Sequence, residues 1–395
     1  MIAAIVLILA FVSFPVLGIP IATLNICSSK RYKWLFFVFL AYAIAIIGYN
    51  FRLQGSGLDL FRHNFTMNQM QNFPTVWSYV LFRHDVFTFL YYYYLKFASF
   101  FGENMLPFIS TFISMLLLFR IIRISSKAAN AGFWAMLTTM LFGCLAINLL
   151  VFCSSFRQVI ALLFFVNLFL TETQKSSSIA KRLICYFGYF FLIFFHTSVI
   201  IIIIMRILVA SVQKHPKYVA IFLLFWAALW ETIRDFIASL GTAFTNNLVV
   251  SMDFYKEYSN TTPLMQLIWI FHICMLVFLL FYIYRSMPKF REMNNEYFKF
   301  CMFTVAFGFG SINAYTLFNR MSMLCWLLTV YLLPQVVENM LKKKRNLAVF
   351  AINGSTILTF AYYCVSIYFA PDSGIYWTSL EDILSSSVLT IIFGR

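Results

Sequence analysis

The sequence predicts an all-α integral membrane protein, because its 395 residues are 62% hydrophobic and only 11% charged. A mean hydropathy of +0.84 is too high for a water-soluble fold of this length, which could not bury so much apolar surface. Apolar runs alternate with short basic groups, and about 20 apolar residues cross a bilayer as a helix. We therefore expect one polytopic transmembrane domain over residues 1–395, with about twelve crossings.

Hydropathy gives eight clear spans and several ambiguous stretches. The clear spans are 2–24, 34–50, 105–122, 133–150, 264–284, 300–318, 321–337 and 347–369. We expect 158–170 to cross once and 183–210 to cross twice, with a break near His196. The stretch 218–237 crosses once in this prediction, whereas the tyrosine-rich stretch 86–101 lies on the outer surface as an interfacial helix. The first span lacks a basic segment before it and is predicted to be retained rather than cleaved.

The basic residues determine the predicted orientation. Twelve crossings place 20 of the 29 Lys and Arg residues inside, among them Lys33, Arg123 and Lys127, whereas a single crossing by 183–210 would place only 13 there. Cytoplasmic loops carry an excess of Lys and Arg. We therefore expect both termini outside and two main outer loops, 51–104 and 238–263. Ten of the 14 acidic residues also fall outside.

Charge and cysteine patterns exclude several classes of protein. The net charge of +15 comes from small basic groups between apolar runs, which is not the pattern of a nucleic-acid-binding surface. The cysteines lie singly, without C-x-x-C spacing, and are expected to be free core residues. No D-x-D or H-x-x-x-H motif offers ligands to a metal ion, so we expect neither a metal nor a cofactor.

Six arginines lie on the predicted outer side, where basic residues are scarce. They are Arg52, Arg62, Arg83, Arg157, Arg234 and Arg320. Because the planar guanidinium group binds phosphate oxygens in pairs, such a set beside a bilayer is suited to a lipid-linked diphosphate. Arg234 is the exception, since Glu231 and Asp235 lie within one helical turn of it and explain it locally.

Other polar residues accompany these arginines at predicted bends. Gly55 and Gly57 permit a turn that lets Arg52 and Asp59 face one another or one substrate, although a solvated surface ion pair explains them equally simply. Arg157, followed by Gln158, lies at an outward bend between two apolar helices, where an interfacial anchor is the alternative interpretation.

Three further positions carry ionisable or amide groups. His196 interrupts 28 nearly uncharged residues, so it either faces a cavity or is a core histidine bonded to a neighbouring hydroxyl. Asn319 and Arg320 repeat the pattern of an arginine at an outward bend between two helices. Asp85 follows Arg83 and His84 just ahead of the aromatic segment.

Taken in order, these motifs resemble the EpsG-like branch of the Wzy-type polymerases, which extend bacterial O-antigen, capsular or exopolysaccharide chains. The resemblance rests on Arg52 with Gly57 and Asp59, on Asp85, on Arg157-Gln158, on Phe195-His196-Thr197-Ser198, and on Asn319-Arg320. Two departures stand out. The family often has a Tyr shortly after the Asp, where this chain has Phe61, His63 and Asn64, and it often has Glu-Pro where this chain has His84-Asp85.

The resemblance implies a metal-independent glycosyltransferase at the outer face of the bacterial cytoplasmic membrane. It would transfer a growing glycan from undecaprenyl diphosphate onto a fresh lipid-linked repeat unit. Donor and acceptor lipids are thus the expected partners, together with membrane lipids, and a chain-length regulator protein is a candidate partner. Arg157 and Arg320 would bind the diphosphate, with Arg52 and Arg83 as candidate partners. Asp59 and His196 are the candidate bases, ahead of His63, His84 and Asp85.

Three other functions fit parts of the pattern. A flippase or exporter of lipid-linked oligosaccharide would share the size and the outer charges but predicts internal symmetry, and no repeat between the halves is visible. A membrane O-acyltransferase would use a histidine such as His196 but leaves the arginines without a role. A ligase that joins the glycan to another acceptor shares the donor chemistry.

Overall fold

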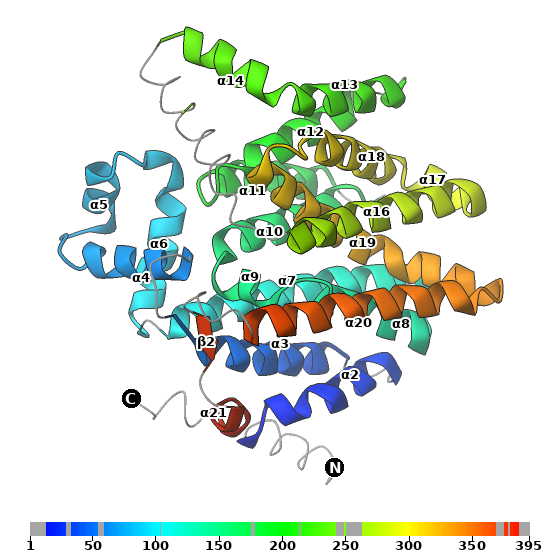
Figure 1. Ribbon diagram of the computed structural model, residues 1–395, viewed down its shortest axis with the longest axis horizontal. Helices are drawn as coiled ribbons and strands as arrows, with labels where there is room; N and C mark the ends of the chain where they lie inside the picture. Colours follow the sequence, from blue (N-terminus) through cyan, green and yellow to red (C-terminus); the bar gives the residue numbers. More distant parts are fainter. Residues whose placement is uncertain are drawn as a thin grey trace. The chain divides into compact units, whose positions relative to one another are not determined.

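The computed structural model describes residues 13–28, 33–53, 59–102, 104–174, 178–212, 215–241, 249, 263–368, 375–377 and 380–386 (Figure 1). These residues are helical almost throughout, which confirms the predicted all-α class. The exception is one pair of three-residue strands, β1 (Phe51–Leu53) and β2 (Ile375–Trp377). The helices group into two compact units. The first comprises Met1–Glu172, Ser176–Val199 and Leu333–Arg395, and the second comprises Thr173–Lys175 and Ile200–Leu332.

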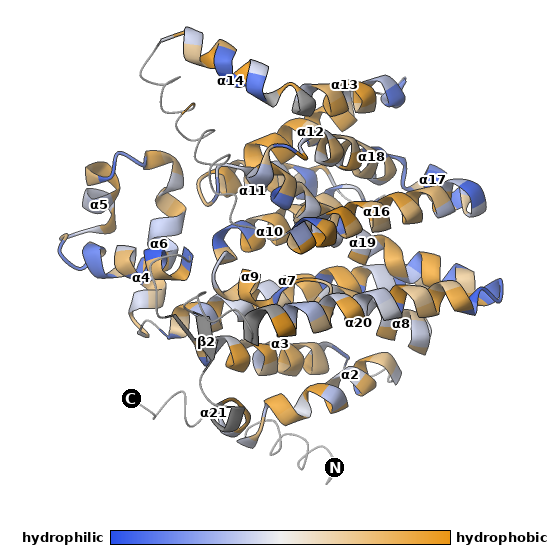
Figure 2. Cartoon of the chain, in the orientation of Figure 1, coloured by the Kyte–Doolittle hydropathy of each residue, from blue (hydrophilic) through white to orange (hydrophobic). Residues whose placement is uncertain are grey.

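Four of the described helices are long and apolar enough to cross a membrane. They are α7 (Met105–Ala129), α16 (Pro263–Ser286), α19 (Tyr315–Lys342) and α20 (Asn346–Tyr368). Several apolar helices of 10–17 residues accompany them, shorter than the ~20 residues of a typical crossing. The number of twelve crossings therefore stays a prediction. Figure 2 shows hydrophobic residues along α16 and α20 and hydrophilic residues gathered on α14 (Trp230–Ser239) and α17 (Pro288–Met293).

The first unit begins with three consecutive helices, η1 (Val16–Gly18), α2 (Ile19–Ser28) and α3 (Lys33–Tyr49). The predicted first span, 2–24, continues to Ser28, and residues 1–12 lie outside the described part of the chain. Helix α3 packs along α7, and the two approach closely at Gly48, where an added Cβ would lie 2.8 Å from Thr111 Oγ1. Beyond α3, Asn50 Nδ2 donates to Ser386 Oγ over 2.9 Å, just after α21 (Leu380–Ser385).

The segment between α3 and α7, which the sequence predicts to be an outer loop, is folded rather than irregular. It contains α4 (Asp59–Met70), α5 (Val76–Phe82), η2 (Val86–Thr88) and α6 (Phe89–Ser99). Helix α5 begins at a capping box in which Thr75 and Ser78 bond each other's backbone. Helix α6 buries Tyr91 and Leu95 and exposes Phe97, so it is amphipathic. The helix expected over 86–101 is thus present, and at 11 residues α6 is too short to cross a bilayer.

The span predicted over 133–150 is broken in the structure. Helix α8 (Phe133–Leu145) ends early, and a separate five-residue helix, α9 (Leu149–Cys153), follows it. The physical reason is Asn148, whose extended backbone and side chain, accepting from the Leu150 N–H over 3.0 Å, cap a new helix rather than continue the old one. Helices α10 (Phe156–Glu172) and α11 (Ile179–Ile193) complete this part.

Polar contacts connect neighbouring helices of the first unit. Arg120 Nη1 on α7 donates to Asn167 Oδ1 on α10 over 2.9 Å. Asn353 Nδ2 on α20 donates to Thr138 Oγ1 on α8 over 3.1 Å. An amide in an apolar bundle needs such a partner because an unpaired polar group is costly to bury. These bonds therefore fix the register of neighbouring helices, which apolar packing alone specifies weakly.

The second unit contains α12 (Val199–Ser211), α13 (Pro216–Ala228), α14, α16, α17, α18 (Asn295–Gly310) and the first part of α19. Arg206 on α12 is buried and bonds Glu296 Oε2 over 2.8 Å. On the next turn of α18, Lys299 Nζ donates to the carbonyl of Val212 over 3.1 Å. His272 on α16 shares a hydrogen bond of 3.0 Å with Ser322 on α19. The outer loop expected over 238–263 lies largely outside the described residues.

The structure corrects the predicted boundary between spans 300–318 and 321–337. Helix α18 ends at Gly310, and α19 begins at Tyr315. The turn lies between them because Gly310 precedes Ser311, whose hydroxyl donates to the Gly308 carbonyl over 2.9 Å. Asn319 and Arg320 consequently lie within the first turns of α19, not at a bend.

Candidate functional site

Several of the predicted site residues in the first unit lie around the turn between α9 and α10. Ser154 Oγ accepts the Leu60 N–H over 3.1 Å, and Ser155 Oγ donates to Asp59 Oδ2 over 3.2 Å. Two consecutive serines thus hold the first turn of α4. The carboxylate of Asp59 also suits this position because an acidic group at a helix start complements the helix dipole. Asp59 remains half-exposed and lies 3.7 Å from Arg62, one turn further on.

Arg157, the second residue of α10, extends from the same turn. This placement confirms the predicted bend at Arg157. Its Nε donates to the backbone carbonyl of Phe195 over 3.0 Å, and its guanidinium carbon lies 4.5 Å from the ring centre of Tyr91, a cation–π contact. A guanidinium has five N–H donors, and among the residues described here only Nε has a bonding partner. The two terminal nitrogens therefore remain available to a ligand.

His63 connects this arginine to α4. It lies one turn after Asp59, is buried, and its Nδ1 hydrogen-bonds the Tyr91 hydroxyl. Its ring centre lies 4.6 Å from that of Phe156. Burial, followed by the positive charge of Arg157, lowers the pKa of His63 to about 3. Burial also raises the pKa of Tyr91, so both groups are neutral near pH 7.

The side chains of His63, Tyr91 and Arg157 are thus in contact, and Asp59 is bonded to Ser155 at the turn that precedes Arg157. We call these four residues the α4–α10 cluster. The sequence indicated Asp59 and Arg157 and ranked His63 behind them, whereas Tyr91 was interpreted only as an interfacial residue. The available signal was the spacing of Asp59 and His63, four residues apart, which places them on one helix face. The run of tyrosines gave no means of telling which one would turn inward.

His196 lies beside the cluster, in the turn between α11 and α12. The break predicted there is confirmed, since α11 ends at Ile193 and α12 begins at Val199. His196 is buried, and its Nδ1 lies 2.8 Å from Ser198 Oγ and accepts the Ser198 N–H over 3.2 Å. Ser198 is thus the neighbouring hydroxyl that is expected if His196 is a core histidine. The carbonyl of the preceding residue, Phe195, is the one that binds Arg157.

Asp85 and Arg83 lie on the connection between α5 and α6. Asp85 Oδ2 accepts from Thr88 Oγ1 over 2.5 Å and from the Tyr92 hydroxyl over 3.1 Å, so it stabilises the start of α6. Burial and the Asp85 charge together raise the pKa of Tyr92 to about 12. Arg83 is exposed at the C-terminus of α5. His84 adopts a left-handed backbone with φ of 51°.

The remaining predicted site residues are distributed over three places. Arg52 lies on β1, opposite Tyr376 of β2, whereas Gly57 lies outside the described residues. Gln158 follows Arg157 on α10 and is half-buried. Asn319 and Arg320 belong to the second unit, on α19. Arg234 pairs with Asp235 over 2.7 Å, which confirms its local explanation.

An apolar cavity of about 550 Å³ lies between helices of the first unit. Side chains of α2, α3, α7, α8 and α20 line it, and Leu149 at the start of α9 lies at its wall. The far end of α9 leads into Ser154 and Arg157, and a five-residue helix is only ~7.5 Å long. The cavity therefore adjoins the element that positions the α4–α10 cluster.

The fold and this cluster define a helical membrane protein with a polar site formed by residues of α4, α6 and α10. The chain belongs to the EpsG family, whose family model matches residues 33–379. This is the family of Wzy-type polysaccharide polymerase-like membrane proteins. The match spans the α4–α10 cluster, His196 and Arg320. Neither the curated proteins nor the solved structures include a match to the chain.

Proposed function

We propose that this protein polymerises undecaprenyl-diphosphate-linked oligosaccharide repeat units at the outer face of the bacterial cytoplasmic membrane. The product would be O-antigen, capsular polysaccharide or exopolysaccharide. Family membership supports the reaction class, glycosyl transfer by a polymerase-like membrane protein. The α4–α10 cluster supports the mechanism.

The observation that carries the proposal is the way Arg157 is held. One N–H is bonded to Phe195, the guanidinium lies against Tyr91, and the terminal nitrogens have no partner among the described residues. Preorganised donors stabilise charge that develops in a transition state, because they need no reorganisation when it forms. A guanidinium also matches the paired oxygens of a diphosphate. Arg157 is thus suited to bind the leaving group of a lipid-linked donor.

Asp59 is the proposed base, since it is half-exposed and lies beside Ser155 at the same turn. The acceptor hydroxyl attacks the anomeric carbon of the donor glycan while the bond from that carbon to the diphosphate oxygen breaks. The hydroxyl proton passes to Asp59, and undecaprenyl diphosphate leaves with its charge against Arg157. Neutral His63 and Tyr91 would hold this geometry without competing for the proton.

Other predicted residues complete the proposal. The substrate contacts are Arg52, Gly57, Arg83, Asp85, Gln158, Asn319 and Arg320, and His196 is a second candidate base. The apolar cavity beside α9 suits part of the isoprenoid tail, because its lining is almost entirely hydrocarbon. A chain-length regulator is proposed as a protein partner, and no metal ion or cofactor enters the scheme.

Purified full-length protein in lipid vesicles, incubated with lipid-linked repeat units, tests this function. The expected product is a ladder of longer lipid-linked glycans. Arg157→Ala should abolish the ladder. Arg157→Lys should recover little of it, because a single ammonium group replaces the planar guanidinium, which can donate two parallel hydrogen bonds. Arg182→Ala removes an exposed arginine on α11 and serves as the control.

Two results would count against the proposal. Movement of unit-length substrate across the membrane without extension would indicate a flippase. Transfer of the glycan only to an added acceptor other than the lipid-linked repeat would indicate a ligase. A full ladder from Arg157→Ala would show that the reaction takes place elsewhere in the protein.

A further inference from the structure

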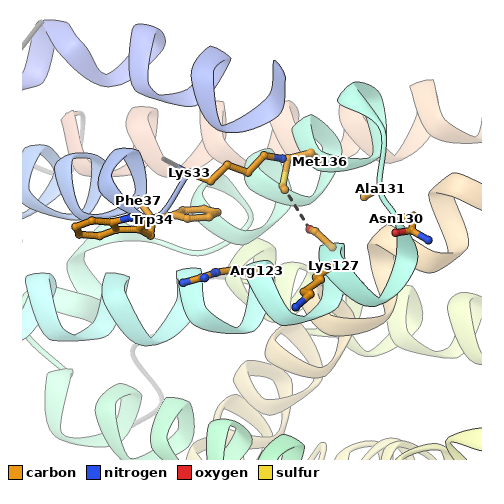
Figure 3. A pocket seen from close by; sticks show the side chains of 9 residues that line it. Lys33, Trp34, Phe37, Arg123, Lys127, Asn130, Ala131 and Met136 are labelled. Atoms are coloured by element: carbon orange, nitrogen blue, oxygen red, sulfur yellow. Dashed lines mark hydrogen bonds between the residues drawn. The ribbon is translucent and has the colours of Figure 1, made fainter. Parts of the chain in front are cut away.

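A second cavity lies in the first unit, at the end of α7 opposite the α4–α10 cluster, and has a different character. It has a volume of about 490 Å³ and is lined by residues of α3, the end of α7 and the start of α8. Figure 3 shows Lys33 extending from α3, with Arg123 and Lys127 coming from α7. No carboxylate lines this cavity among the residues that the structure describes. We call it the basic cavity.

The walls of the basic cavity combine charge with aromatic surface. Trp34 is 56% exposed and Phe37 is buried, and both lie on α3 beside Lys33. The hydroxyl of Ser126 donates to Met136 Sδ over 3.4 Å, which joins α7 to α8 at the cavity (Figure 3). Exposed tryptophan with lysine and arginine is typical of the interface between a bilayer and water.

Glu338, an acidic residue near the basic cavity, already has partners. Glu338 on α19 accepts the Gly132 N–H over 3.0 Å and lies 3.7 Å from Lys342. It does not line the basic cavity. Three cationic residues from two helices, Lys33, Arg123 and Lys127, therefore line one cavity.

We propose that the basic cavity binds the phosphate group of an anionic membrane phospholipid. Basic pockets between transmembrane helices on the cytoplasmic side bind such headgroups, and the positive-inside pattern assigns Lys33, Arg123 and Lys127 to that side. The volume lies within the range of ligand pockets, ~300–1,000 Å³. The aromatic wall favours a lipid over a soluble phosphate, because the exposed ring of Trp34 offers contact to the glycerol and acyl part of a lipid. This site is separate from the proposed glycan chemistry.

The test measures lipid binding by native mass spectrometry of the purified full chain. Phosphatidylglycerol is titrated against phosphatidylcholine, and inorganic phosphate and glycerol phosphate form the soluble arms. The double substitution Arg123→Gln and Lys127→Gln should weaken phosphatidylglycerol binding roughly thirtyfold, since each basic residue near an anionic surface contributes about 1 kcal/mol. Phosphatidylcholine and the soluble anions should bind far more weakly than phosphatidylglycerol.

The matched control is the double substitution Lys181→Gln and Arg182→Gln. It removes the same charge from exposed positions on α11, which the sequence assigns to the same membrane side, and it should leave the affinity unchanged. If the cavity variant is not monodisperse, Lys33→Gln tests the wall formed by α3. It should lower the affinity for phosphatidylglycerol about fivefold. An equal loss in the control, equal binding of phosphatidylcholine, or phosphate binding as tight as the lipid would each overturn the proposal.

Discussion

The close approach of α3 and α7 at Gly48 leads to a quantitative prediction for Gly48→Ala. The new Cβ would lie 2.8 Å from Thr111 Oγ1, 3.2 Å from the carbonyl oxygen of Pro107 and 3.3 Å from Cys153 Sγ. Thr111 can rotate, but its hydroxyl would then lose its 3.4 Å contact with Cys153. The Pro107 carbonyl is backbone and moves only with α7.

The expected net effect of Gly48→Ala is destabilisation. Overpacking costs ~1–3 kcal/mol, whereas alanine in place of a helical glycine gains ~1 kcal/mol. The difference is a loss of roughly 0–2 kcal/mol in the free energy of unfolding, and the backbone contact with Pro107 favours the upper part of that range. Gly354→Ala on α20 is the matched control, because nothing lies within 4 Å of its added Cβ. It should be neutral or stabilising.

Unfolding of the purified protein in mild detergent, followed by circular dichroism against denaturant, measures both variants. The additional substitution Thr111→Ala in the Gly48→Ala protein should recover part of the loss, because it removes the nearest atom. If Gly48→Ala unfolds at the same denaturant concentration as Gly354→Ala, or higher, then the tight contact between α3 and α7 is not present in the folded protein.

Three further predictions concern charge. Asp59→Asn should abolish glycan extension in the vesicle assay without lowering the unfolding midpoint, since an amide oxygen still accepts from Ser155; retained extension would remove Asp59 as the base. His63 should not titrate between pH 5 and 8 in an NMR pH titration. Because its pKa is lowered in the folded state, its contribution to stability is present above its unfolded pKa of ~6.5 and is lost as the pH falls toward 3, and His63→Gln should flatten this part of the stability profile. Glu296→Gln should cost about 1–3 kcal/mol in denaturant unfolding because it leaves Arg206 buried without its carboxylate; an unchanged midpoint would show that the pair contributes nothing.

Several elements could be predicted from the sequence because their signals are local. Apolar runs gave the positions of α3, α7, α16 and α20 to within a few residues, except at the end of α7, and the break at His196 followed from a polar residue in a long apolar stretch. Helix boundaries within continuous apolar sequence were less accessible. The early end of α8 depends on the single side chain of Asn148, and the turn before α19 depends on Ser311 rather than on Arg320.

The candidate site required the tertiary structure, since its members come from α4, α6 and α10. The sequence alone determined the class of protein, and it singled out Asp59 and Arg157 as candidates, because hydropathy and residue chemistry can be read one segment at a time. Only the folded chain decided that Tyr91, one of four consecutive tyrosines, joins His63 to Arg157, and that Asp85 serves α6. Side-chain burial and pairing depend on neighbours distant in sequence. For the same reason, only the tertiary structure shows that Arg123 and Lys127 of α7 line one cavity with Lys33 of α3.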